Sequence, residues 1–458
     1  MLITQVVVVA LFVCVSLGAG IQYWRRTRQA WAQVATAWQL SQNEAGRMGM
    51  NPPRLTGQID GFDIDASFIE RHVGRTSIVL RSERLPQNLR LKREGLGQTF
   101  QSVFSKDIQT EDDLFDELVL IEGDELQTVA LLNSTVRAAA TELIQSGGYV
   151  SDGEIHWRHT GGLVSAEQLN GRIDTLVRFA KTLELNRQDV HQQPTMLSRN
   201  ALTDPLGSVR HRNLDLLLKN FPQHKVASAT ARQALADHLP EVRLIAAIHL
   251  QEEGHEVLKS LLENNRLPTA RRCDGIRSLR SEPLRMDMAP VIRQVARSGE
   301  PTVACCAIEL LAMNDDPELL DIFSHQAKPD IDKDLAIAIA QTIAEQRIEG
   351  ALDILLKLLA HKTASVQIET AKALAVVGRV EAIEPLLRLT EGFFTTGDVK
   401  PAAQRAVRTI QGRLGNVSSG QLSLTDADAA QGALSVASAE AGAVSMLPEL
   451  PAEVEVTE

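Results

Sequence analysis

The stretch ASVQIETAKALAVVGRVEAIEPLLRL, residues 364–389, sets the architecture of the second half of the chain. It contains an alanine-rich segment that includes Val366 and Leu374, and a shorter apolar segment, PLLRL, at 385–389. Apolar residues that recur every three to four positions are typical of amphipathic helices. We therefore predict a pair of helices within this stretch.

The same pattern recurs along residues 199–413. An apolar or arginine anchor residue opens each copy, and the anchors are 29 to 33 residues apart, which is the range of helical solenoid repeats. A helix pair of this size cannot bury its apolar face alone, so we predict that the pairs stack into one continuous core. The anchors are Val209, Val242, Arg271, Val303, Leu335, Val366 and Val399, and the residues eight positions later are all aliphatic: Leu217, Leu250, Leu279, Leu311, Ile343, Leu374 and Val407.

Two of these segments, PEVRLIAAIHL at 240–250 and the stretch at 364–389, resemble HEAT-like repeats. That family carries a Pro/Asp-x-V-R entry and an alanine-rich first helix. The resemblance covers about residues 199–413 and implies an all-α solenoid of about seven repeats. It also implies that the array is an interaction scaffold, since only a minority of such arrays are lyases or nucleic-acid enzymes.

Residues 267–297 differ from the rest of the array in charge, with seven arginines against three acidic residues. The arginine fork matches carboxylate and phosphate groups. We predict a partner-binding site for an acidic peptide, a polyanion or the chain's own acidic tail, and the alternative is a solvated helix face with ion pairs inside the array. The predicted site residues are Arg271, Arg272, Arg277 and Arg280.

Residues 54–195 read as a mixed α+β domain. The predicted strands precede or alternate with helices, which argues for a sheet with helices on one face. Asp152-Gly153 is a typical hairpin turn between two of them. The β-rich runs are Gln58–Ala66, Thr76–Ser82, Leu89–Arg93, Leu118–Glu122 and Tyr149–Trp157, and the helical ones are Asp124–Gln145 and Ser165–Leu185.

Charge is segregated within this domain, because residues 71–93 are mainly basic and residues 107–125 are acidic. The basic segment either faces anionic lipid or pairs with the acidic one as a neighbouring element. Residues 54–185, with GQIDG at 57–61, Leu85-Pro86 and DIQTEDDLFDELVLIEGDE at 107–125, resemble an uncharacterised domain of bacterial membrane-anchored proteins. That domain commonly has glycine at the position of Glu111, and the resemblance transfers no activity.

The first residues predict a membrane anchor, because no charged side chain occurs from Leu2 to Tyr23 and about 20 apolar residues span a bilayer. A cleaved signal peptide is the alternative. The tryptophans at 24, 31 and 38 lie on one stripe of a juxtamembrane helix, residues 24–45, which packs on the next domain, forms a coiled coil or lies on the bilayer. The predicted membrane-interface residues are Tyr23, Trp24, Arg25, Arg26 and Arg28.

Composition limits the remaining possibilities. The net charge is −11, and residues 414–458 form an acidic, Ala/Ser/Gly-rich tail that we predict to be disordered. Four cysteines in 458 residues favour a reducing compartment over a disulfide scaffold. The sequence pI near 5.6 disfavours nucleic acid as a partner. No spacing of a metal site, a cofactor loop or a catalytic triad is recognisable, so we predict no metal, no cofactor and no enzyme activity.

The predicted fold class is an α+β membrane-proximal domain followed by an all-α HEAT-like solenoid, with a single N-terminal transmembrane helix over residues 2–23. Arginines directly after the apolar run place the protein in the inner membrane with its bulk in the cytoplasm. The predicted function is a membrane-anchored scaffold that binds a protein partner, acidic in character, and forms homo-oligomers through residues 24–45. The alternatives are an enzyme or enzyme regulator with a site in 54–195, or polyanion binding through 267–297.

Overall fold

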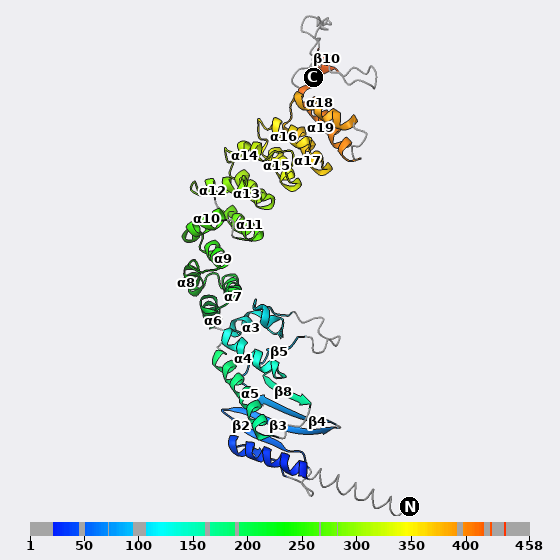
Figure 1. Cartoon of the computed structure of the whole chain (residues 1–458). Helices are drawn as coiled ribbons and strands as arrows, with labels where there is room; N and C mark the ends of the chain where they lie inside the picture. Colours follow the sequence, from blue (N-terminus) through cyan, green and yellow to red (C-terminus); the bar gives the residue numbers. More distant parts are fainter. Residues whose placement is uncertain are drawn as a thin grey trace, which may run out of the picture. The chain divides into compact units, whose positions relative to one another are not determined.

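The computed structural model describes residues 22–44, 51–71, 73–94, 107–160, 165–187, 192–264, 267–281, 283–391, 397–415, 422–423 and 435–436 (Figure 1). The chain divides into two compact units, the first ending at Leu258 and the second beginning at Lys259. The division falls inside helix α10 (His255–Glu263) and therefore within the predicted repeat array. The two units are described separately.

Eight strands of the first unit form one sheet in the order β1-β2-β3-β4-β8-β7-β5-β6. All neighbouring strands run antiparallel. The strands are β1 (Ser41–Gln42), β2 (Arg54–Ile59), β3 (Phe62–Arg71), β4 (Val73–Arg81), β5 (Arg90–Arg93), β6 (Val119–Glu122), β7 (Gly148–Ser151) and β8 (Glu154–Thr160), and a separate pair is formed by β9 (Leu422–Ser423) and β10 (Ser435–Val436).

Two hairpins of this sheet turn at an Asp-Gly pair. Asp152 and Gly153 have φ values of 51° and 78°, which confirms the predicted turn between β7 and β8. Asp60 and Gly61 have φ values of 53° and 86° and join β2 to β3 in the same way. The prediction of one β-rich run over 58–66 was therefore wrong, since positive φ at both positions reverses the chain.

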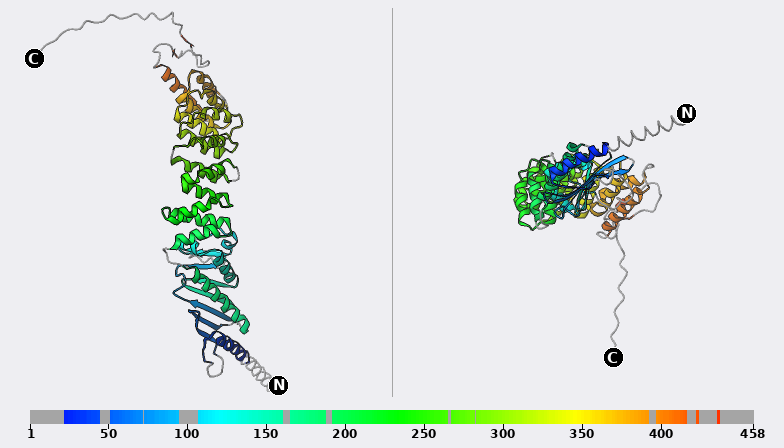
Figure 2. Two further views of the ribbon diagram at one scale, coloured as in Figure 1. Left: turned by 90° about the vertical axis from the view of Figure 1, so that its left-hand side faces the viewer. Right: turned by 90° about the horizontal axis from the view of Figure 1, so that it is seen from below.

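Helices cover one face of the sheet (Figure 1). The strands alternate between buried apolar residues such as Ile64 and Leu80 and polar residues such as Asp65 and Arg81 on the other face. The helix over residues 22–38, α1, lies beside the sheet (Figure 2). It contacts the sheet through Trp24, whose ring centroid lies 5.1 Å from that of Phe68. The sheet thus buries a single apolar face, as its alternation requires.

The long helix predicted over Asp124–Gln145 is two helices. Asn133 interrupts it, because its side chain accepts a hydrogen bond from Val136 N (3.0 Å) and so caps a new helix. The helices of the first unit are α2 (Asp113–Asp116), α3 (Glu125–Leu131), α4 (Ser134–Gln145), α5 (Ala166–Asn186), α6 (Gln193–Thr203), α7 (Gly207–Asn220), α8 (Lys225–Ala234), α9 (Pro240–Leu250) and the 3₁₀ helix η3 (Gln251–Gly254).

The second unit is helical and compatible with a repeat solenoid. The odd-numbered helices α11 to α19 pack on one another in one layer, and α12, α14, α16 and α18 pair with them in a second layer (Figure 1). The helices are α11 (Thr269–Ser278), α12 (Ala289–Ala296), α13 (Pro301–Met313), α14 (Leu319–Gln326), α15 (Lys333–Gln346), α16 (Leu352–Leu359), α17 (Ala364–Val377), α18 (Ile383–Glu391) and α19 (Val399–Gly415), with 3₁₀ turns η4 (Leu279–Ser281) and η5 (Val380–Ala382).

The predicted transmembrane fold class and inner-membrane localisation are corrected by the structure. The described part of the chain contains no helix that is both long and apolar enough to cross a membrane. The apolar residues 2–21 on which the prediction rested lie outside the described residues. Trp24, which was assigned to the membrane interface, is buried against the sheet, and the stripe of tryptophans is the packing face of α1.

The backbone at Glu111 explains one feature of the acidic segment. Its φ of 67° lies in the left-handed region, which favours glycine over residues that carry a Cβ. We expect Glu111→Gly to be more stable than Glu111→Ala by about 1 kcal/mol, because alanine keeps the strain of Cβ. Urea unfolding of both variants measures the difference.

The control for this prediction is Glu117, an exposed residue six positions later with a right-handed φ of −68°. There glycine gains nothing and loses more conformational entropy on folding, so Glu117→Ala should be the more stable variant. The same order of alanine and glycine at both positions would contradict the assignment of strain to Glu111.

Candidate functional site

The four predicted site arginines of the second unit lie in three different environments. Arg272 is buried, with a side chain 3% exposed, and its Nη1 donates to Glu300. Arg280, at 35% exposure, forms an ion pair with Glu309 of α13. Both side chains therefore connect α11 and η4 to the α13 region. Their positive charges are neutralised by the carboxylates of Glu300 and Glu309.

Arg271 and Arg277 are the exposed pair. They lie on the same surface of α11 with side chains 41% and 54% exposed. Asp274 lies between them, with Oδ2 at 3.5 Å from Arg271 Nη1 and Oδ1 at 3.9 Å from Arg277 Nη1. Two guanidinium groups thus share one carboxylate at long distance, which leaves a net positive charge and unused donors on this helix surface.

Two further arginines of the segment connect α12 to α14 and the turn before it. Arg293 of α12 donates to both Asp316 and Glu318, at 2.9–3.0 Å and 2.6 Å, and Arg297 donates to Glu318 and Asp321, both at 2.8 Å. Hydrogen bonding to these carboxylates raises the pKa of both guanidinium groups. The alternative of ion pairs inside the array therefore describes these side chains.

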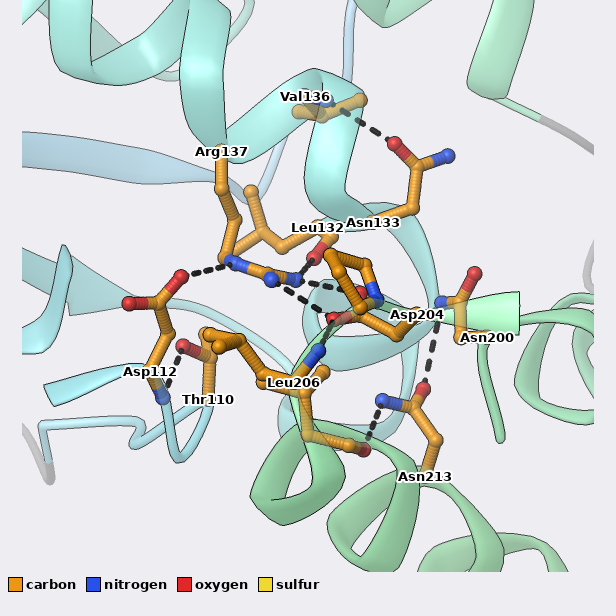
Figure 3. A network of polar contacts seen from close by, with 12 residues as sticks. Thr110, Asp112, Leu132, Asn133, Val136, Arg137, Asn200, Asp204, Leu206 and Asn213 are labelled. Atoms are coloured by element: carbon orange, nitrogen blue, oxygen red, sulfur yellow. Dashed lines mark hydrogen bonds and ion pairs between the residues drawn. The ribbon is translucent and has the colours of Figure 1, made fainter. Parts of the chain in front are cut away.

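Arg137 of α4 is the centre of a buried polar network in the first unit (Figure 3). Its Nη1 and Nη2 donate to the Asp204 carboxylate at 3.0 and 3.1 Å, and its Nε donates to Asp112 Oδ2 at 2.8 Å. Nη1 also donates to the carbonyl of Leu132 at 2.9 Å. Burial lowers the pKa of the guanidinium, but the two carboxylates outweigh it, and the net direction is upward. The guanidinium is permanently charged and its donors are used within the protein.

The network joins the acidic segment to the first helices that follow the sheet. Asp112 caps α2, and Asp204 directly follows α6. An amide pair lies beside it, in which Asn200 Nδ2 donates to Ala130 O (2.9 Å) and to Asn213 Oδ1 (3.2 Å) of α7 (Figure 3). Arg137 was not among the predicted site residues, although a charged residue on the apolar face of a helix indicates a buried partner.

Carboxylates of the acidic segment 107–125 accept hydrogen bonds from the backbone of the same segment. Asp116 accepts hydrogen bonds from Thr110 N, Thr110 Oγ1 and Glu111 N, at 2.8–3.1 Å. Asp107 Oδ1 accepts from Ile121 N at 3.0 Å, and Phe115 is buried. Strands β5 and β6 pair side by side, with Glu122 within 3.9 Å of Arg90 and Lys92. These side chains of the acidic segment therefore have structural roles. Arg90 and Lys92 of the basic segment lie beside the acidic segment.

Two histidines of β8 stack on aromatic rings, and the cysteines of α11 and α13 are free thiols. His156 stacks on Tyr149 and His159 on Trp157, with ring centroids 4.7 and 5.6 Å apart. Burial lowers the pKa of His156 and raises the pKa of Cys273 and Cys305 to about 12, so both thiols stay protonated at neutral pH. Over the described ranges, no group of three or more His, Cys, Asp or Glu side chains could hold a metal ion.

The predicted membrane-interface residues lie on α1. Tyr23, Arg25 and Arg26 are exposed, and Trp24 is buried. Arg28 donates to the backbone carbonyls of Asn43 and Asn51. Trp38 Nε1 donates to Asn170 Oδ1 of α5 at 3.0 Å, so this helix is bonded to the same unit along its length.

Comparison with known proteins names no family for this chain, since no protein-family model and no curated protein matches its sequence.

Proposed function

We propose that the protein is a HEAT-like scaffold whose repeat array binds an acidic segment of a protein partner. The observation that carries this proposal is the exposed pair Arg271 and Arg277, which share one carboxylate, Asp274. Paired charges such as Arg293 with Asp316 have little left to offer a ligand. A surface with two guanidinium groups and one carboxylate recruits a second carboxylate from outside.

The layered packing of the second unit supports a binding role. Each odd-numbered helix packs on the next, so the exposed residues of successive helices form continuous rows. The resemblance of 240–250 and 364–389 to HEAT-like repeats points the same way. An acidic peptide laid along these rows would meet Arg271 and Arg277 at the α11 position.

The test is binding of a fluorescent peptide rich in Asp and Glu to the full chain, with heparin as a second probe. Changing Arg271 and Arg277 together to Glu should weaken peptide binding at least tenfold, which corresponds to about 1.4 kcal/mol. The matched control is Arg405→Glu with Arg408→Glu, two exposed cations on α19 of the same unit. That variant carries the same charge change and should bind as the original chain does.

Three results would contradict the proposal. Equal loss in both double variants would show that only net charge matters. Binding of heparin without binding of the peptide, with a steep decrease as salt rises, would assign the surface to polyanions. Absence of binding to either probe would remove the acidic ligand altogether.

A further inference from the structure

A cavity of about 470 Å³ opens in the first unit. Four segments meet around it: residues 84–89 between β4 and β5, helix α3, the end of α5 and the start of α6. Its floor is made of buried residues, including Leu89, Ala130 and Met196, and its rim is exposed and charged. The size is that of small-molecule sites in other proteins.

Two polar side chains in the floor lack partners. Thr128 is 4% exposed and Gln193 is 7% exposed, and both line the cavity. Within the part of the chain that the structure describes, neither the Thr128 hydroxyl nor the Gln193 side-chain amide makes a hydrogen bond with another residue. Neither group is among the described polar side-chain atoms that are closed off from solvent without a partner, so both are open to the cavity and available to a bound molecule.

Glycine at position 123 keeps the space in front of the hydroxyl open. A Cβ at this position would lie 2.8 Å from Thr128 Oγ1 and 2.8 Å from the carbonyl oxygen of Asn88. Both distances are too short for a side chain to be accommodated. A side chain at residue 123 would therefore push against the Thr128 hydroxyl and the Asn88 carbonyl, and both of these residues line the cavity.

The rim holds one cation and one anion that are not neutralised. Arg84 Nη1 donates to Glu184 Oε1 at 3.0 Å, so these two charges cancel. Arg187 donates to a backbone carbonyl, that of Glu83, and Asp124 accepts from the backbone N of Gln127 at 2.9 Å. In the described ranges neither Arg187 nor Asp124 belongs to an ion pair, so the rim carries opposite charges with no charged partner.

We propose that this cavity binds a free amino acid, with the zwitterionic head group at the rim and the side chain in the floor. A simple anion would leave Asp124 without a charged partner, and a simple cation would leave Arg187 without one. Sugars usually stack on an aromatic ring, and none of the described lining residues is aromatic. The unpaired hydroxyl of Thr128 and the amide of Gln193 favour a side chain that carries an amide, as in glutamine or asparagine.

The test is thermal unfolding of the full chain with each of the twenty L-amino acids at saturating concentration. Glutamine or asparagine should raise the unfolding temperature of the first unit by about 2–4 °C, monitored through its tryptophans. Sodium acetate and ethylamine each present one half of the head group. Glucose tests sugars, and phosphate tests anions. The proposal is overturned if one of these four compounds raises the unfolding temperature and the amino acids do not. It is also overturned if no compound of the panel raises the unfolding temperature.

Isosteric variants locate the site. Thr128→Val and Gln193→Leu remove only the unpaired groups, so without ligand they should unfold at the same temperature or higher. Each should weaken amino-acid binding at least tenfold, as measured by isothermal titration calorimetry. Exposed Gln127 at the cavity edge gives a milder variant, Gln127→Leu, which spares the core and should weaken binding less.

Thr175→Val is the matched control. Thr175 is 9% exposed in the same unit, but its hydroxyl donates to Gly171 O at 3.0 Å and does not line the cavity. This variant should lose stability and keep the affinity for the amino acid. If Thr128→Val loses as much stability as Thr175→Val, the Thr128 hydroxyl has a structural partner and the proposed site is wrong.

Discussion

Replacing Arg137 by methionine is expected to destabilise the first unit by about 3–5 kcal/mol. The substitution keeps much of the buried aliphatic volume but leaves the Asp204 carboxylate, which is 0% exposed, without either guanidinium hydrogen bond. Asp112 and the carbonyl of Leu132 each lose one donor as well. Urea unfolding followed by tryptophan fluorescence measures the loss, because all four tryptophans lie in this unit.

Arg178→Met is the control for this result. Arg178 of α5 pairs with Glu142 at 2.8 Å, but the two side chains are 57% and 54% exposed. Exposed pairs contribute about 0–1 kcal/mol, so this variant should be close to the original chain in stability. A loss at Arg137 no larger than the loss at Arg178 would show that the buried network does not hold the unit together.

Replacing Arg272 by glutamate is expected to cost about 4 kcal/mol or more in the second unit. The new carboxylate would be buried in the place of a side chain that is 3% exposed, next to Glu300, and would have no cation to pair with. Thermal unfolding followed by circular dichroism measures the effect. Arg272 is therefore a packing residue of the α11 region, and its reversal tests folding more than binding.

Arg277→Glu is the matched change on the same helix. Its side chain is 54% exposed, so the charge reversal remains solvated and should alter stability by less than about 0.5 kcal/mol. Equal stability of the two variants would mean that Arg272 is not buried as described. The contrast also justifies a binding test built on Arg271 and Arg277 alone.

The repeat spacing was the most informative part of the sequence. The seven predicted anchors all lie in odd-numbered helices from α7 to α19, and six of them are buried. Arg271 is the exception, since its neighbour Arg272 takes the buried position. Periodicity reports which face of a helix is apolar, but it does not report which of two adjacent arginines has a carboxylate within reach.

Other features needed contacts between distant residues. The turn at Asp60-Gly61 follows the same rule as Asp152-Gly153, and the break at Asn133 is a local helix cap, so both were predictable from the sequence. The pairing of Arg137 with Asp204 joins residues far apart in the chain, as does the cavity floor of Thr128 and Gln193. The tryptophan stripe of α1 was correctly predicted. Whether it faces a bilayer or the sheet could not be predicted without the contact between Trp24 and Phe68 of β3.

The layered helices of the second unit have a consequence for the way it opens. Each of α13, α15 and α17 packs on one odd-numbered helix before it and one after it. Loss of the pair α18 and α19 would therefore expose a single face of α17 and leave α11 with all its neighbours. Fraying can proceed inward from the C-terminal end one helix pair at a time, so the cost of each step is a nearest-neighbour interface and not the whole core.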